Sequence, residues 1–217
     1  MARTLLLDLD GTLVDTVPDI AAALNRLMEA RSLARFTPSE VAAMVGDGVG
    51  ALLVKAFAAR GRTQDDAALA EFSADYTAHV AVASRVYPRV PGVLRDLIDD
   101  GWTLAVCTNK PERAARALLS AVDLLGLVRA IGGGDSFPVR KPDPAHLLRT
   151  LERVGGAPNR AVMLGDHHND IHAAAGAGLP AIFATWGYGT LGPADRCAAT
   201  ASDIGQAAEI ARQLLPR

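Results

Sequence analysis

Two carboxylates stand at the end of the first apolar run of the chain. Asp8 and Asp10 follow Leu5–Leu7, and Gly11 and Thr12 come directly after them. In a β-strand, residues i and i+2 point to the same side, so we expect both acids to project together from one strand end. Adjacent carboxylates repel each other unless a cation lies between them or one takes a proton. The spacing therefore predicts a functional site at this strand end. The simpler alternative is a strand that happens to end in a polar turn.

Two later segments of the chain supply a hydroxyl group and a lysine. Thr108 and Asn109 follow the apolar run 102–107, and Pro111 is expected to start the next helix. A hydroxyl and N–H groups at a helix N-terminus can bind an anion, although Thr108 would serve equally well as the helix cap. Two prolines fix the backbone near Lys141, so its ammonium can be held in place; a solvated loop lysine is the alternative.

A second acid pair follows the apolar run 161–164. Asp166 and Asp170 lie at the start of a helix, where carboxylates suit the helix dipole, and capping by Asp166 or Asn169 is the simple explanation. Their oxygens are also ligands that suit a hard cation such as Mg²⁺. Taken together, these strand ends can hold one Mg²⁺ and one phosphoryl group, and they offer a carboxylate nucleophile that can form an aspartyl-phosphate.

The elements that must position these groups fall into two kinds. Apolar residues recur at helical spacing from about 15 to 85, and Thr37 to Glu40 reads as a capping box. From about residue 87, apolar strand-like runs alternate with helical stripes. This alternation predicts a parallel sheet that is covered on both faces, and the helical segment interrupts it just after the first strand. The insert would lie over Asp8 and Asp10 as a lid that excludes water.

Composition excludes several classes of protein. The chain has 217 residues, half of them hydrophobic, which is enough for one large domain or a domain with an insert. A net charge of −2 gives no reason to expect nucleic acid or an anionic membrane as a partner. No apolar run approaches the roughly 20 residues that span a bilayer, and no secretion segment is recognisable. Cys107 and Cys197 do not form a disulfide framework, so we expect a cytoplasmic protein.

The four motifs together resemble those of the haloacid dehalogenase-like hydrolase superfamily, in the same order and over nearly the full chain. Further segments look like the phosphoglycolate phosphatase branch. The superfamily motifs are Asp8-Leu9-Asp10-Gly11-Thr12, Thr108-Asn109, Lys141-Pro142 and Gly165-Asp166…Asp170; the branch-like segments are Asp10 to Ile20, Val45 to Gly48, Thr108 to Pro111 and Lys141 to Pro144. The resemblance implies an α/β fold with a Rossmann-like parallel sheet core at 1–14 and 86–217, and an inserted helical cap domain at 15–85.

The resemblance also implies catalytic roles. Asp8 would attack phosphorus in line, and Asp10 would protonate the leaving oxygen and later take a proton from the hydrolytic water. Lys141 would offset the charge on the nucleophile and on the transferring group, and Thr108 would bind phosphoryl oxygens. These four residues are the expected catalytic set.

Binding roles follow in the same way. The residues expected at the substrate phosphate are Gly11, Thr12, Thr108, Asn109 and Lys141. Mg²⁺ would be held by Asp8, the backbone carbonyl of Asp10, and Asp166, with Asp170 acting through water or on Lys141.

One departure from the family pattern concerns histidines. His167 stands where relatives commonly have a small hydroxyl residue, and His168 and His172 have the spacing that could hold a transition metal on one helix face. The simpler interpretation, which we favour, places these side chains in solvent or behind the metal ligands.

We therefore expect a Mg²⁺-dependent phosphatase of small phosphomonoesters, with 2-phosphoglycolate as the favoured substrate. A phosphomutase on a sugar phosphate, or a phosphatase of another metabolite phosphate, is the alternative, and a non-catalytic binding protein is a third possibility. A dehalogenase is disfavoured because it has no need of the acid Asp10. The partner would be a small phosphate ester, and the chain would be a monomer or homodimer. The candidates for binding a substrate carboxylate are Lys55, Arg60, Arg62, the turn 46–50 and Lys110.

Overall fold

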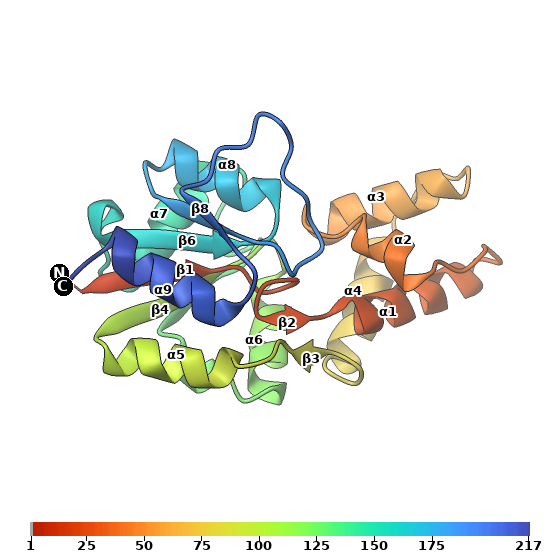
Figure 1. Cartoon of the computed structure of the whole chain (residues 1–217). Helices are drawn as coiled ribbons and strands as arrows, with labels where there is room; N and C mark the ends of the chain where they lie inside the picture. Colours follow the sequence, from red (N-terminus) through yellow and green to blue (C-terminus); the bar gives the residue numbers. More distant parts are fainter. Residues whose placement is uncertain (1) are drawn as a thin grey trace.

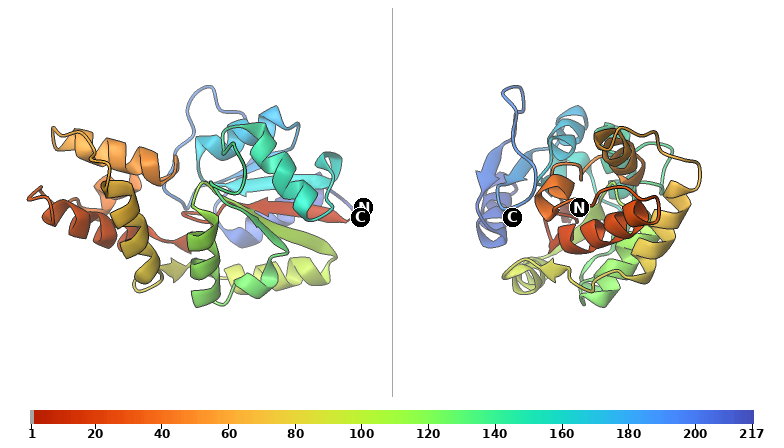
Figure 2. Two further views of the ribbon diagram at one scale, coloured as in Figure 1. Left: turned by 180° about the vertical axis from the view of Figure 1, so that it is seen from behind. Right: turned by 90° about the vertical axis from the view of Figure 1, so that its right-hand side faces the viewer.

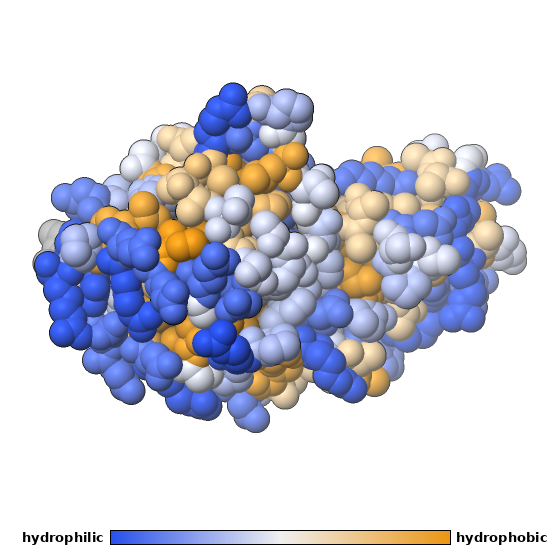
Figure 3. Space-filling view, in the orientation of Figure 1, coloured by the Kyte–Doolittle hydropathy of each residue, from blue (hydrophilic) through white to orange (hydrophobic). Residues whose placement is uncertain are grey.

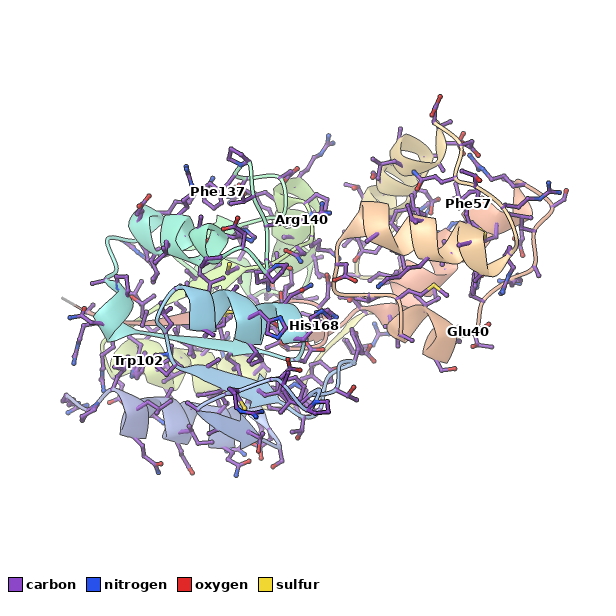
Figure 4. All side chains as sticks on the ribbon, turned by 90° about the horizontal axis from the view of Figure 1, so that it is seen from above. Glu40, Phe57, Trp102, Phe137, Arg140 and His168 are labelled. Carbon is purple, nitrogen blue, oxygen red and sulfur yellow. The ribbon has the colours of Figure 1, made fainter. Side chains whose placement is uncertain are left out.

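The structure is a computed structural model that describes residues 2–217. It has two parts, an α/β core and a layer of helices beside it, joined through a narrow waist (Figures 1 and 3). Figure 4 labels Trp102 and Phe137 in the core, and Glu40 and Phe57 in the helical layer.

A parallel sheet forms the centre of the core. Its order is β5-β4-β1-β6-β7-β8, so the strand before Asp8 lies between neighbours on both sides, with Leu7 opposite Val106 and Leu164. Runs of apolar residues form strands because both faces of the sheet are covered. The bounds are β1 Arg3–Leu7, β4 Trp102–Cys107, β5 Ala130–Gly132, β6 Ala161–Gly165, β7 Ala181–Ala184 and β8 Ala199–Ala201.

Helices cover both faces of this sheet, as Figure 2 shows from two further directions. Leu5 and Leu7 face one group of helices, α5 (Val90–Asp99), α6 (Glu112–Ala121) and α9 (Ile204–Leu214). Leu6 points the other way, as the period of two requires, and packs with α7 (Pro144–Arg153) and α8 (His168–Gly176). The parallel, doubly covered sheet predicted from the alternating pattern is confirmed.

The helical layer has its own apolar core. Its helices are α1 (Val17–Glu29), α2 (Pro38–Ala42), α3 (Val49–Ala59) and α4 (Ala68–Ala78). Leu24, Leu53 and Phe72 meet in a cluster that is separate from the two clusters around the sheet. The predicted capping box is present, since Thr37 accepts from Glu40 N and the Glu40 carboxylate accepts from Thr37 N.

Two short strands join the layer to the core. β2 (Val14–Asp15) leaves the core and β3 (Arg85–Val86) returns to it, and the two pair antiparallel with Val14 opposite Val86. The sequence did not predict them, nor the edge strand β8 or the 3₁₀ turns η1 (Leu125–Leu127) and η2 (Pro158–Arg160), because each has only two or three residues. Among the helices described here, none is long and apolar enough to cross a membrane.

Candidate active site

The carboxyl ends of four neighbouring strands bring the predicted charged groups together. Asp8 follows β1, Thr108 follows β4, Lys141 lies in the loop after β5, and Asp166 and Asp170 follow β6. Parallel strands present their carboxyl ends at one edge of a sheet, which is where open α/β sheets bind ligands. All five residues are buried.

Lys141 lies at the centre of this group. Its Nζ is 2.9 Å from Asp8 Oδ1 and 2.6 Å from Asp170 Oδ1, and it donates to the carbonyl of Cys107 at 2.6 Å. Burial alone lowers the pKa of Lys141, but Asp170 and Asp8 outweigh it and raise the pKa above its ordinary value. The lysine is therefore a fixed positive charge between two carboxylates, and not the solvated loop lysine of the simpler interpretation.

The neighbouring buried histidine holds the lysine loop. Lys141 N donates to His146 Nδ1 at 3.1 Å. Burial lowers the pKa of His146 to about 4, and the nearby Lys141 adds to this effect, so the ring is a neutral acceptor at pH 7. No motif in the sequence predicts this contact.

Three carboxylates form a cluster suited to a cation. Oxygens of Asp8, Asp166 and Asp170 all lie within 4.8 Å of one another. Burial and the charge of Asp8 together raise the pKa of Asp166 to about 6 and that of Asp170 to about 7, although Lys141 acts in the opposite direction on Asp170. Close carboxylates in a buried place are the donor set that a hard divalent cation prefers. The cluster is thus a candidate metal site.

Neighbouring groups orient these ligands. Thr12 Oγ1 donates to Asp166 Oδ1 and Tyr188 N donates to Asp166 Oδ2, both at 2.8 Å. His167 N donates to Asp170 Oδ2 at 3.0 Å. Each of the two acids therefore has a hydrogen-bond donor that fixes its direction.

Gly11 and Thr12, which are predicted at the substrate phosphate, lie in the turn that follows β1. Gly11 N donates to Val14 O and Thr12 N to Leu9 O, and the Thr12 hydroxyl is used by Asp166. Neither residue lines the cavity described below. Gly11 has φ +81°, and a Cβ there would collide with the Asp166 carboxylate, so its role is to let the chain turn beside that ligand.

The Asp10 side chain is not part of the acid cluster and has partners of its own. It accepts from Thr16 Oγ1 at 2.7 Å, and the ammonium of Lys110 lies 2.9 and 3.1 Å from its two oxygens. Burial lowers the pKa of Lys110, but Asp10 outweighs it and the pKa lies above its ordinary value. The lysine is 6% exposed, so Asp10 has a buried cationic partner.

Thr108 and Asn109 occupy the loop between β4 and α6. Pro111, not Thr108, is the N-cap of α6, and Thr108 Oγ1 instead accepts from Lys110 N at 3.3 Å. The Asn109 amide group donates to Lys141 O and to Gly46 O, each at 2.9 Å. Its side chain thus joins the lysine loop to the helical layer.

The helical layer reaches the site through the turn around Gly46. Asn169 Nδ2 donates to Asp47 Oδ1 at 2.8 Å and lies 3.4 Å from Gly46 O. Gly46 has φ +121°, and a Cβ there would lie 2.5 Å from the His167 ring. The turn can therefore pack against the core only because residue 46 lacks a side chain.

The histidines take places that the sequence left open. His167 is the N-cap of α8, with its Nδ1 accepting from Asn169 N at 3.3 Å, and Asp170 completes a capping box. His172 Nε2 lies 2.7 Å from Asp195 Oδ1. Side-chain ligand atoms of Asp47, His167 and His168 also lie within 4.8 Å of one another. Figure 4 shows His168 and Arg140 at the end of the core that faces the helical layer.

A cavity of about 790 Å³ lies between the core site and the helical layer. Its core wall includes Asp8, Asp10, Thr108 and Asp166, and its other wall is largely apolar. The predicted cationic candidates from the helical layer do not line it. Lys55 pairs with Asp47 at 2.6 Å, and Arg60 donates to backbone carbonyls of residues 34 and 35.

The model of the haloacid dehalogenase-like hydrolase family matches residues 2–178, which include all four motifs and the helical layer. The chain belongs to this family of hydrolases. The resemblance inferred from the motifs is confirmed, and with it the α/β class of the hydrolase.

Individual relatives agree with the family match. The hydrolase is 39% identical over 196 residues to a phosphoglycolate phosphatase of Rhodospirillum rubrum, covering 87% of this chain and 81% of the relative. It is 42% identical over 189 residues to a phosphoglycolate phosphatase of Caulobacter vibrioides, covering 85% of this chain and 80% of the relative. The crystal structure of a predicted phosphoglycolate phosphatase from Haemophilus somnus superposes with a TM-score of 0.86 at 28% identity, covering 96% of this chain and 97% of the other.

Proposed function

We propose that this hydrolase is a Mg²⁺-dependent phosphatase of 2-phosphoglycolate that works through an aspartyl-phosphate on Asp8. The observation that carries the proposal is that Asp8, Asp10 and Asp166 line one wall of a cavity, with Lys141 and Asp170 in contact with Asp8 or close to it behind that wall. The choice of 2-phosphoglycolate as substrate is supported by relatives that are about 40% identical and are named phosphoglycolate phosphatases.

Asp8 is the nucleophile in this proposal. Lys141 holds one of its oxygens at 2.9 Å and offsets its charge, which reduces repulsion between the carboxylate and an approaching phosphoryl group. Thr108 and Asn109 line the same cavity as Asp8, and the Thr108 hydroxyl and the backbone N–H of Asn109 would bind phosphoryl oxygens. Because Lys141 also bonds Asp170 and Cys107 O, its ammonium is already oriented before substrate binds.

Asp10 is the proton carrier. It lies on the cavity wall, and its side chain is held by Thr16 and Lys110. Held there, it can give a proton to the leaving alcohol and take one from the water that attacks the intermediate. The two aspartates of the first motif therefore have separate partners and separate tasks.

The acid cluster fits a divalent cation. Asp8, Asp166 and Asp170 bring three carboxylates within 4.8 Å, and one lysine contacts two of them. Asp8, Asp166 and the backbone carbonyl of Asp10 would hold Mg²⁺, with Asp170 acting on Lys141. When bound, Mg²⁺ neutralises charge on the phosphoryl group. Thr12 and Tyr188 N keep Asp166 directed toward this place.

We infer that residues 15–85 act as the cap over this site. The two linkers β2 and β3 leave and rejoin the core beside Asp10, and the turn around Gly46 contacts Asn109 and Asn169. Such a cap excludes bulk water while the phosphoryl group is transferred.

A panel of phosphomonoesters tests the proposal. With Mg²⁺, we expect kcat/KM for 2-phosphoglycolate to exceed that for sugar phosphates, and phosphate and glycolate to be released in equal amounts. Addition of a chelator should abolish turnover, and Mg²⁺ should restore it. Isomerisation of a sugar phosphate without net phosphate release would show a phosphomutase instead, and no hydrolysis of any ester would show a non-catalytic protein.

A further inference from the structure

The cap wall of the cavity has few polar groups. Most of its side chains are apolar, including Val49, Leu52 and Leu69. Helix α4 adds three hydroxyls, and two of them are used within the helix: Ser73 Oγ donates to Leu69 O and Thr77 Oγ1 to Ser73 O, both at 2.6 Å.

The third hydroxyl is that of Tyr76, and it has no partner. Its oxygen is buried without a hydrogen bond among residues 2–217, although the side chain is only 4% exposed and lines the cavity. Burying a hydroxyl without a hydrogen bond is unfavourable, so an unpaired hydroxyl beside a cavity calls for a partner from a water or a ligand. The phenyl ring is fixed by stacking on Phe72, with ring centroids 6.0 Å apart.

A buried cation lies beside this hydroxyl. The Lys110 ammonium is 4.4 Å from the centroid of the Tyr76 ring and 2.9 Å from Asp10 Oδ1. An ammonium has three N–H groups, and the two oxygens of Asp10 use at most two of them. The third N–H points to no oxygen of Asp10 and is left for the nearby Tyr76 oxygen or for a ligand between Asp10 and Tyr76.

We propose that Tyr76 and Lys110 form a carboxylate-binding subsite for the leaving group of the substrate, an inference that rests on the proposed phosphatase function. The leaving oxygen must lie within hydrogen-bond reach of Asp10, its proton donor. In 2-phosphoglycolate a single methylene separates that oxygen from the carboxylate. The carboxylate is thus confined to the surroundings of Asp10, where Lys110 and Tyr76 line the cavity.

The charges at this place agree with the assignment. Burial raises the pKa of Tyr76, and the phenol is therefore a donor at neutral pH. Asp10 alone would repel a second carboxylate, and Lys110 offsets that repulsion. Arg113 also lines the cavity, but it is exposed, so a carboxylate bound there would gain less than one bound by a buried lysine and hydroxyl.

Paired substrates isolate the subsite. Ethyl phosphate has a methyl group where 2-phosphoglycolate has its carboxylate, so the ratio of their kcat/KM values measures carboxylate recognition alone. For Tyr76→Phe we expect this ratio to fall about 10- to 100-fold, the effect of one hydrogen bond to a charged group, mainly through KM for 2-phosphoglycolate. Ser73→Ala removes a hydroxyl one turn away on the same helix and should keep the wild-type ratio.

A lysine variant separates recognition from proton transfer. Lys110→Met should lower kcat/KM for both esters, because Asp10 loses its partner. It should lower kcat/KM for 2-phosphoglycolate by a further factor of about 10 or more. Melting temperatures of the variants close to that of the wild type would confirm that they are folded.

The outcomes distinguish this inference from the proposed function. The subsite would be overturned if Tyr76→Phe left the ratio of kcat/KM values for 2-phosphoglycolate and ethyl phosphate unchanged, which includes equal losses on both esters. It would also be overturned if this ratio fell only in Arg113→Met. Wild-type preference for a different carboxylated ester, with the ratio still sensitive to Tyr76→Phe, would overturn 2-phosphoglycolate as substrate and leave the subsite standing.

Discussion

The two walls of the cavity are built in opposite ways. On the core wall, each charged group has partners from more than one element: Lys141 contacts Asp8, Asp170 and Cys107 O, while Asp166 is held by Thr12 and Tyr188 N. On the cap wall, most side chains are apolar and the Tyr76 hydroxyl has no partner in the described structure.

This difference separates two tasks. Phosphoryl transfer needs charges that are oriented before substrate arrives, and buried ion pairs across strand ends provide this. Substrate selection needs groups whose hydrogen-bond partner is supplied only by the ligand. The cap joins the core through two short linkers, so it can present such groups without disturbing the charge network.

Lys141→Met should have the largest effect, because it removes the centre of the core network. We expect kcat to fall about 100- to 1000-fold. The free energy of unfolding should fall by about 3–5 kcal/mol in urea titrations, since buried Asp8 and Asp170 lose their cation. Lys55→Met, which breaks an exposed pair with Asp47, should cost less than about 1 kcal/mol. Equal losses of stability in the two variants would contradict the conclusion that the buried ion pairs around Lys141 stabilise the fold more than an exposed pair does.

Thr12→Val distinguishes orientation of a metal ligand from phosphate binding. Because the hydroxyl donates to Asp166, its loss should weaken Mg²⁺ affinity about 10- to 100-fold. Titration of activity with Mg²⁺ would show this, with kcat recovering at high Mg²⁺. A raised KM for substrate at saturating Mg²⁺ would instead support the phosphate-binding role predicted from sequence.

Gly46→Ala tests the contact between cap and core. The new Cβ would overlap the His167 ring, and the backbone there has positive φ, so the turn must move. We expect a loss of about 1–3 kcal/mol in stability, and kcat/KM lower by about 10-fold because Asn109 loses Gly46 O as acceptor. Gly50→Ala is the matched control in helix α3, where nothing lies within 4 Å, and should be neutral or stabilising. Wild-type kinetics in Gly46→Ala would contradict a functional contact.

His146→Gln should change how stability depends on pH. The pKa of His146 is lowered from 6.5 to about 4 in the folded protein, so between these values the unfolded chain binds a proton that the folded protein does not. Stability is therefore lost as pH falls from about 6.5 toward 4, by about 1–2 kcal/mol at pH 5 from this group. Urea titrations at pH 7 and pH 5 should show a smaller difference for the glutamine variant than for the wild type. The same difference in both would exclude His146 as the cause.

Much of the core wall could be predicted from the sequence. Parallel strands present their ends at one edge, so polar residues after Leu7, Cys107 and Leu164 had to meet, and helical periodicity placed α1, α3 and α4 in the insert. Local capping rules also gave the Thr37–Glu40 box, which the structure contains. These features depend on a few neighbouring residues or on one rule of sheet topology.

The rest depends on contacts between distant residues. Lys110 reaches Asp10 across 100 positions, and Thr12 reaches Asp166 across 154, so no local pattern shows which hydroxyl serves a ligand and which serves the substrate. The free hydroxyl of Tyr76 lay unrecognised within an apolar helical stripe. A cytoplasmic location and the choice between monomer and homodimer stay predictions.

The most direct test of the central claim is detection of phosphate on Asp8. Wild-type protein and Asp8→Asn would be mixed with 2-phosphoglycolate and Mg²⁺, quenched in acid within one turnover, digested and analysed by mass spectrometry. We predict a phosphoryl group on the wild-type peptide that contains Asp8, lost on treatment with hydroxylamine, and neither the adduct nor turnover in Asp8→Asn. Turnover that persists in Asp8→Asn, or a phosphoryl group on another residue, would contradict the account.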